Sequence, residues 1–169
     1  MGTLRLILAL AVVINHGGGV NGFYPFPGSY AVQVFYLISG FLIAYILAEK
    51  YGTERKWLFY SNRALRIYVP YFFVWTATLL LSLGVLYLKG YSFGNFTQLY
   101  VHAKDFSWLS WAYVSITNMG ILGQDLGLYL GYKEGDLYWT QQFWTSPVQV
   151  NTFQLLPQSW SMALELMFY

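Results

Sequence analysis

Residues 67–88 carry no charged side chain, and this stretch constrains the fold of the chain more than any other feature. As an α-helix rising about 1.5 Å per residue, it is long enough to cross the hydrocarbon core of a bilayer, which is about 30 Å thick. A second apolar run occupies residues 30–48, and a shorter one occupies residues 3–16. These runs predict helices that lie in a lipid bilayer.

Composition supports a membrane protein and excludes several other classes. Charged residues make up 9% of the chain, whereas a soluble domain carries about 25%. The absence of cysteine excludes disulfides, a thiolate nucleophile and zinc–thiolate sites, and no pattern of metal ligands is present. A net charge of +2 without a basic tract gives no indication of a nucleic-acid partner. The sequence therefore predicts an all-α fold, a polytopic transmembrane helix bundle.

The distribution of basic residues predicts the topology. Residues 49–66 hold most of the Lys and Arg side chains, and short basic loops stay in the cytoplasm. The N-terminus is therefore expected in the cytoplasm, and the glycine-rich link after the first helix is expected outside. Helices are expected near residues 3–16, 30–48, 67–88, 106–122 and 159–169.

Two of these helices leave questions open. Residues 106–122 are apolar but rich in Ser, Thr and Asn, so this segment either spans the membrane or re-enters it, and we favour re-entry. Residues 159–169 form a helical pattern without a stop signal, so the chain is expected to be a truncated N-terminal portion of a larger protein.

Arg5 and His16 are the first candidates for chemistry. They stand 11 positions apart in the first helix, which places them on one face, about 16 Å apart along the axis. Ionisable residues within a membrane span usually face a polar cavity. Alternatively, Arg5 is a cytoplasmic anchor and His16 caps the last carbonyl groups of the helix.

Arg63 and Arg66 share one face at the cytoplasmic start of the third apolar run. Two guanidinium groups in this arrangement suit a phosphate or pyrophosphate. Anchoring by the positive-inside rule is the alternative, and composition alone favours it. Pro70 is expected in the first turn of the helix, where its missing N–H costs least.

The last helix holds a third cluster. Ser159, Trp160 and Ser161 begin it, and Glu165 is a carboxylate in an apolar run, four residues after Ser161. Such a carboxylate is costly unless it is paired or functional, although a role in helix packing is the alternative. Asn118 is a weaker candidate for the lining of a polar cavity, and a role in stabilising the loop is the favoured alternative.

Four stretches together carry a resemblance to a known family. They are LRLILALAVVINH at 4–16, VFYLISGFLI at 34–43, YSNRALRIYVP at 60–70 and SWSMALELMFY at 159–169. Their order and spacing resemble those of acyltransferase family 3, membrane acyltransferases that include bacterial O-antigen and exopolysaccharide acetylases. The chain departs from the pattern at Leu166, where a second acidic residue is common, and residues 91–157 match loosely.

The resemblance implies part of a roughly ten-helix membrane protein of the bacterial inner membrane, with no bound cofactor. Acyl-CoA, such as acetyl-CoA, is the expected donor, and a hydroxyl of a carbohydrate or lipid-linked glycan is the expected acceptor. His16 and Glu165 are then the catalytic candidates, and Arg5, Arg63 and Arg66 bind acyl-CoA. Ser159, Trp160, Ser161 and Asn118 are the supporting candidates. The alternatives are a fragment of a transporter or channel and a non-catalytic membrane packing protein.

Overall fold

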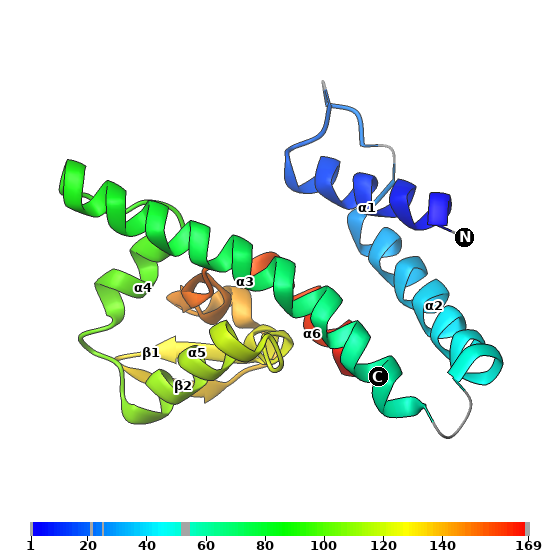
Figure 1. Cartoon of the computed structure of the whole chain (residues 1–169). Coiled ribbons are helices and arrows are strands. Elements are labelled where there is room, and N and C mark those ends of the chain that lie inside the picture. Colours follow the sequence, from blue (N-terminus) through cyan, green and yellow to red (C-terminus); the bar gives the residue numbers. More distant parts are fainter. Residues whose placement is uncertain (1, 21, 25, 52–54, 168–169) are drawn as a thin grey trace. The chain divides into compact units, whose positions relative to one another are not determined.

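The computed structural model describes residues 2–20, 22–24, 26–51 and 55–167, apart from the side chains of His16, Ser29 and Glu165. The chain divides into two compact units, an N-terminal unit up to Asn62 and a C-terminal unit from Arg63 to Met167. Figure 1 shows the helices and strands of both units. Most of the described residues are helical, which confirms the predominantly helical character predicted from the sequence.

Two helices that pack against each other form the core of the N-terminal unit. Helix α1 covers Gly2–His16 and α2 covers Gly28–Ile46, followed by a π-helical turn, η1, over Leu47–Tyr51. Their contact is made by small and aliphatic side chains, which let helices approach closely in an apolar solvent. The buried residues of this contact are Leu8, Ala11, Ala31 and Ile38.

Glycine residues end helix α1. The backbone N–H of Gly17 donates to the carbonyl of Val13, and that of Gly19 donates to the carbonyl of Ile14, both at 2.9 Å. Gly18 and Gly19 have φ values of +84°, a left-handed conformation that glycine adopts without a steric penalty. The last carbonyl groups of α1 therefore have partners in the backbone.

Helix α3 is the longest element and contains the boundary between the two units. It covers Lys56–Lys89, 34 residues, and so begins earlier than the apolar run at 67–88 from which it was predicted. Pro70 consequently lies in the interior of the helix, and its predicted place in the first turn is wrong. Since proline has no N–H, the carbonyl of Arg66 lacks its usual helical donor.

A small antiparallel sheet in the C-terminal unit corrects the all-α prediction. Its strands are β1 at Leu130–Lys133, β2 at Asp136–Trp139 and β3 at Val148–Gln149, in the order β2-β1-β3. Between β1 and β2, both turn residues have positive φ, +49° at Glu134 and +97° at Gly135. Turns of this kind match the twist of a hairpin. Strands this short carry too few residues for a period of two to be visible in the sequence.

Short helices complete the C-terminal unit around the sheet. They are α4 at Phe96–His102, α5 at Trp108–Gly120, α6 at Trp160–Met167, and the 3-10 turns η2 at Asp125–Tyr129, η3 at Phe143–Thr145, η4 at Val150–Phe153 and η5 at Pro157–Ser159. A buried apolar cluster joins α5, β1 and η4, and it consists of Phe106, Val114, Tyr132, Val150 and Phe153. With 13 residues, α5 is about 20 Å long, too short to cross the bilayer.

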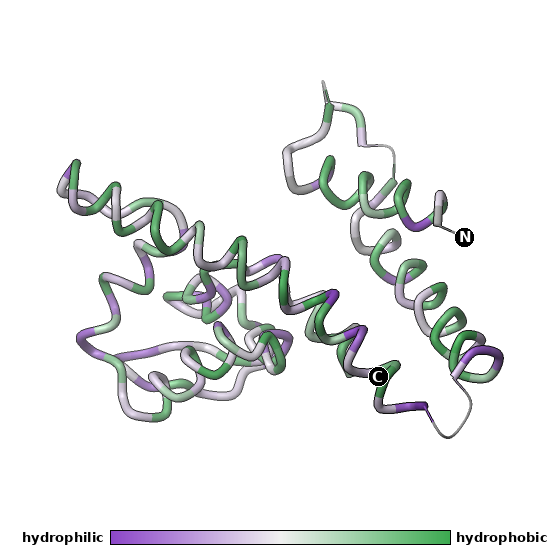
Figure 2. Tube along the Cα trace, viewed as in Figure 1, coloured by the Kyte–Doolittle hydropathy of each residue, from purple (hydrophilic) through white to green (hydrophobic). Residues whose placement is uncertain are grey.

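In the described part of the chain, two helical stretches are long and apolar enough to span a membrane. One runs from Tyr30 to Tyr51 and the other is α3, while the apolar helix at Thr3–Asn15 is shorter. In Figure 2 the hydrophilic residues of α3 are concentrated in its first turns and hydrophobic residues follow. This division is what a helix requires when it enters lipid from a polar surface.

Candidate functional site

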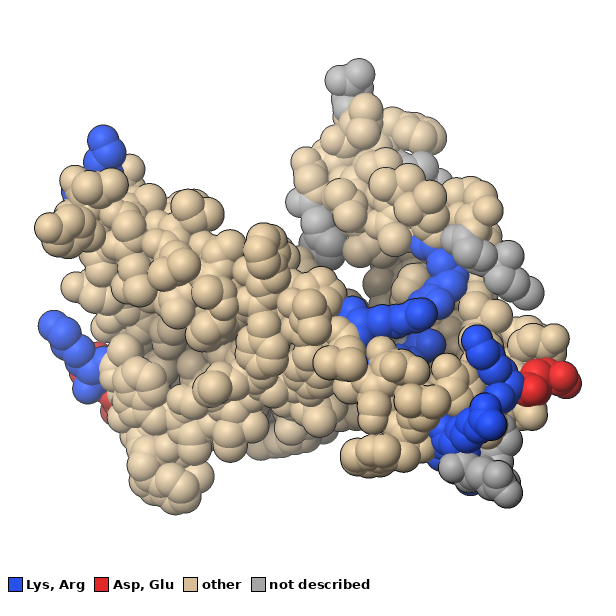
Figure 3. Space-filling view, viewed as in Figure 1, with Lys and Arg blue, Asp and Glu red and all other residues tan. Residues whose placement is uncertain are grey.

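The two arginines of α3 mark one end of its apolar stretch. Arg63 is half-buried and Arg66 is exposed, and no further charged residue occurs in the helix until Lys89. Figure 3 shows Lys and Arg side chains gathered toward the ends of the C-terminal unit, with an uncharged surface between them. The spacing of Arg63 and Arg66 therefore places two guanidinium groups on one face of α3, at the end of its apolar stretch.

Helix α6 packs against the part of α3 that follows these arginines. Ala163 is fully buried, and it forms an apolar cluster with Tyr71 of α3 and Ile121. Leu166 of α6 and Ile67 of α3 pack around the same cluster. The structure thus brings together the two motifs that carry Arg63, Arg66 and Glu165, although the side chain of Glu165 lies outside the described residues.

Ser159 belongs to a buried polar network at the start of α6. Its hydroxyl lies within hydrogen-bond distance of two acceptors, Gln124 Oε1 at 2.8 Å and the carbonyl of Leu156 at 2.5 Å. Gln124 Nε2 in turn donates to the carbonyl of Thr117 at 2.9 Å and lies 3.4 Å from the hydroxyl of Tyr71. Because the network joins α3, α5 and α6, it fixes where α6 begins.

Asn118 connects α5 to the segment that precedes α6. Its Nδ2 donates to the carbonyls of Val114 at 2.9 Å and Phe153 at 3.2 Å, and its Oδ1 accepts from the N–H of Leu155 at 2.9 Å. The hydroxyl of Tyr71 donates to the carbonyl of Asn118. Each polar atom of this buried side chain thus has a backbone partner, which assigns Asn118 to the support of the fold.

We expect Asn118→Leu to lower the free energy of unfolding by about 3 kcal/mol. Leucine has a similar size but leaves the buried carbonyl of Phe153 and the N–H of Leu155 without partners. Thermal unfolding in detergent, followed by circular dichroism, measures the loss. Asn95→Leu is the matched control, because the side chain of the half-buried Asn95 donates to the carbonyl of Gln154 and is not enclosed by the network around Asn118. Equal melting temperatures for the two variants would contradict the assignment.

The remaining supporting candidates lie at the first turn of α6. Trp160 is half-buried, and the hydroxyl of Ser161 donates to the carbonyl of Gln158 at 3.1 Å. The four supporting candidates therefore fall into two pairs. Ser159 and Asn118 belong to the buried network, where Gln124 and Tyr71 link them, whereas Trp160 and Ser161 lie at its edge.

In the N-terminal unit, Arg5 packs on an aromatic ring. Its guanidinium carbon lies 4.6 Å from the centre of the Phe35 ring, a cation–π contact between α1 and α2. His16 is the last residue of α1, and its side chain lies outside the described residues. The predicted pairing of His16 with Glu165 joins residues of separate units and stays a prediction.

Sequence reasoning missed three members of the buried network. Tyr71, Thr117 and Gln154 are at most 3% exposed, and Gln154 Nε2 donates to the hydroxyl of Thr117 at 2.7 Å. Their only sequence signal was polarity within apolar surroundings, which does not reveal partners so distant in the chain. Among the described residues, no group of three or more His, Asp or Glu side chains is placed to hold a metal ion.

A comparison with families of known proteins matches residues 1–169 to the family described as an acyltransferase domain. No curated protein sequence and no solved structure matches the chain. The family match covers the whole sequence. It includes the arginine pair of α3 and the motif of α6, the helix that packs against α3. The chain therefore belongs to acyltransferase family 3, a membrane-associated family of acyltransferases.

Proposed function

We propose that this protein is an integral membrane O-acyltransferase that uses acyl-CoA, with acetyl-CoA as the first candidate. The acceptor is a hydroxyl of a carbohydrate or of a lipid-linked glycan. The observation that carries the proposal is the family match over residues 1–169. The donor and acceptor are inferred from the motifs that the chain has in common with acetylases of this family.

The proposed location is the bacterial inner membrane, with the N-terminus in the cytoplasm. The basic residues 49–66 support this orientation, because short loops rich in Lys and Arg stay on the cytoplasmic side. Acyl-CoA is a cytoplasmic metabolite that carries several phosphate charges. Arg63 and Arg66 would thus face the compartment that supplies the donor.

His16 is the proposed general base. Its imidazole takes the proton of the acceptor hydroxyl as the hydroxyl oxygen attacks the thioester carbonyl carbon. A C–O ester bond forms, the C–S bond breaks, and the CoA thiolate receives the proton from the imidazolium. Glu165 orients the imidazole in this scheme, while Ser159 and Asn118 hold α6 and its neighbours in place.

Arg5, Arg63 and Arg66 are the proposed ligands of the donor. A guanidinium fork binds phosphate oxygens in pairs, which a point charge does not. Phe35 supports this role for Arg5, because the ring holds the guanidinium at 4.6 Å from its centre and limits the orientations of the side chain.

Acyl transfer in membranes tests the proposal. Membranes from cells that produce the protein receive acetyl-CoA labelled in the acetyl group, together with an extract of envelope glycans. The expected product is labelled glycan whose label is released by hydroxylamine or mild base, as an O-acetyl ester is. Matched membranes without the protein are the control. Uptake of label without a new ester would favour a transporter and contradict the proposal.

Replacing both Arg63 and Arg66 with Gln should raise the KM for acetyl-CoA about tenfold or more. The change removes charge-assisted hydrogen bonds, each of which contributes about 1.5–3 kcal/mol. Initial rates of acetyl transfer over a range of acetyl-CoA concentrations measure the effect. The KM for the acceptor should stay near the wild-type value.

Lysine at the same two positions separates phosphate binding from membrane anchoring. The double Arg→Lys variant keeps both positive charges and so keeps a membrane anchor, but it loses the planar fork. We expect this variant to resemble the Gln variant in its KM. A wild-type KM with Lys would show that the two arginines serve only as anchors.

A further inference from the structure

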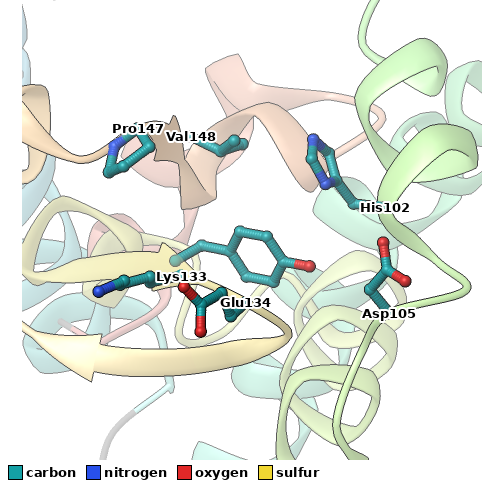
Figure 4. A pocket seen from close by; sticks show the side chains of 7 residues that line it. His102, Asp105, Lys133, Glu134, Pro147 and Val148 are labelled. Carbon is teal, nitrogen blue, oxygen red and sulfur yellow. The ribbon is translucent and has the colours of Figure 1, made fainter.

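An open pocket of about 710 Å³ lies in the C-terminal unit, away from the motif residues. Its polar lining comes from three places in the chain: His102 at the end of α4, Asp105 before α5, and the hairpin with Tyr132, Lys133 and Glu134. Pro147 and Val148 add an apolar wall. In Figure 4, Lys133 and Glu134 lie across the pocket from His102 and Asp105. Small-molecule sites have volumes of about 300–1,000 Å³, so the pocket has the size of one.

Tyr132 gives the pocket a buried hydrogen-bonding group. The residue is 3% exposed, and its ring packs edge-to-face with those of His102 at 5.4 Å and Phe153 at 4.9 Å. Among the described residues its hydroxyl makes no hydrogen bond within ordinary geometric limits, although the backbone of Gly135 lies near it. Burial and the nearby carboxylate of Asp105 raise its pKa, so the phenol remains a neutral donor.

A buried hydroxyl without a partner is costly, and a ligand is one way to satisfy it. The ring contacts hold Tyr132 in one orientation, and its backbone is fixed as well. Its N–H donates to the hydroxyl of Ser146 at 3.0 Å, and that hydroxyl also donates to the carbonyl of Val148 at 2.8 Å. The wall of the pocket that holds Tyr132, Lys133 and Val148 therefore belongs to the paired strands β1 and β3.

Charge at this edge of the unit identifies it as a water-facing surface. The pocket residues Asp105, Lys133 and Glu134 are exposed, and Lys104 and Asp136 are their exposed neighbours in the chain. Helix α4 follows the Lys89 end of α3, the end opposite to Arg63 and Arg66 (Figure 1). The pocket residues His102 and Asp105 follow this end of α3 in the chain.

The side chains that line the pocket suit a neutral polyhydroxylated ring better than they suit acyl-CoA. Two carboxylates face one ammonium group, so an anion such as the phosphates of acyl-CoA is disfavoured. Sugar hydroxyls both donate and accept, and the pocket offers carboxylates to accept, with a phenol and an ammonium group to donate. The rings of Tyr132 and His102, with Pro147 and Val148, supply apolar surface for the C–H face of a sugar.

We propose that this pocket binds a saccharide ring, the part of the acceptor that carries the hydroxyl to be acylated or a neighbouring sugar of the same glycan. The inference rests on the proposed function for the identity of the acceptor. The pocket consists of residues of the C-terminal unit alone, so saccharide binding can be measured without acyl transfer.

Saturation-transfer NMR on the full chain, in a detergent without a sugar headgroup and without acyl-CoA, tests the proposal. The probes are methyl pyranosides of glucose, galactose, mannose and N-acetylglucosamine. At least one should bind, and Asp105→Asn should weaken that binding about tenfold. Tyr132→Phe should weaken it about fivefold, because it removes only the phenol hydroxyl. Tyr138→Phe, on β2 and outside the pocket lining, should bind as the wild type does.

The Tyr132→Phe variant also separates binding from folding. Removal of a buried hydroxyl without a partner should leave the melting temperature unchanged or slightly raised. Absence of binding by all four glycosides, or wild-type binding by both pocket variants, overturns the saccharide site. Sugar binding without any acyl transfer in the membrane assay would remove the proposed function and leave the pocket assignment standing.

Discussion

Replacing His16 with alanine should lower the rate of acyl transfer by about 10²–10⁴-fold, because a positioned general base contributes a factor of this size. The protein should still insert and fold. The carbonyls of Val13 and Ile14 at the end of α1 accept from the N–H groups of Gly17 and Gly19, so they have partners without the imidazole. The measurement is the initial rate of ester formation in membranes, normalised to the amount of protein.

His16→Gln distinguishes catalysis from helix capping. A glutamine side chain can still donate a hydrogen bond to a carbonyl at the end of α1, but it cannot take a proton from a hydroxyl. We expect His16→Gln to be as slow as His16→Ala. If either protein inserts normally and transfers acyl groups at the wild-type rate, His16 is not the base.

The membrane helices could be predicted from the sequence because the signal is one of composition. An apolar run longer than the bilayer core has few stable alternatives, and α3 and the stretch from Tyr30 to Tyr51 have the required length. The start of α3 was harder to predict from the sequence. Lys56, Arg63 and Arg66 interrupt the apolar pattern, so the run indicated a helix only from residue 67, and Pro70 was assigned to the wrong part of it.

The sheet was missed because its stability comes from contacts that are distant in sequence. Strand β1 has four residues, and its buried Tyr132 packs on Phe106 and Phe153. The turn carried a partial signal at Gly135, because glycine adopts positive φ without a steric penalty. The high content of aromatic residues around it was equally compatible with a loop at the membrane surface.

The candidate site, like the fold, could be predicted from the sequence only in part. The pairing of Arg63 and Arg66 follows from helical spacing alone, and the family motifs identify His16 and Glu165 in the sequence. The network that positions α6 could not be predicted in this way. Ser159 is bonded to Gln124, 35 residues away, and Gln124 lies beside Tyr71, 53 residues away. Polar side chains at such separations become partners only through the packing of α3, α5 and α6.

Gly135→Ala should be strongly destabilising, with a loss of about 4 kcal/mol in the free energy of unfolding. A Cβ at this position would overlap the carbonyl oxygen of Asp105, and the φ of +97° is one that alanine rarely adopts. Strain of this kind costs about 1–3 kcal/mol, and overpacking against backbone adds a similar amount. The carbonyl of Gly135 also accepts from the N–H of Ser107 at 3.0 Å and the hydroxyl of Ser110 at 2.6 Å.

Gly94→Ala provides the matched control for the conformational part of this loss. Gly94 has a φ of +62°, and an added Cβ there would have no atom within 4 Å. Its loss should therefore be about 1–2 kcal/mol, the cost of a left-handed alanine without a clash. Thermal unfolding in detergent compares the two variants, and equal losses would contradict the close contact at Asp105. Because Gly135 joins the hairpin to Asp105, its replacement should also abolish glycoside binding by the pocket, whereas Gly94→Ala should preserve it.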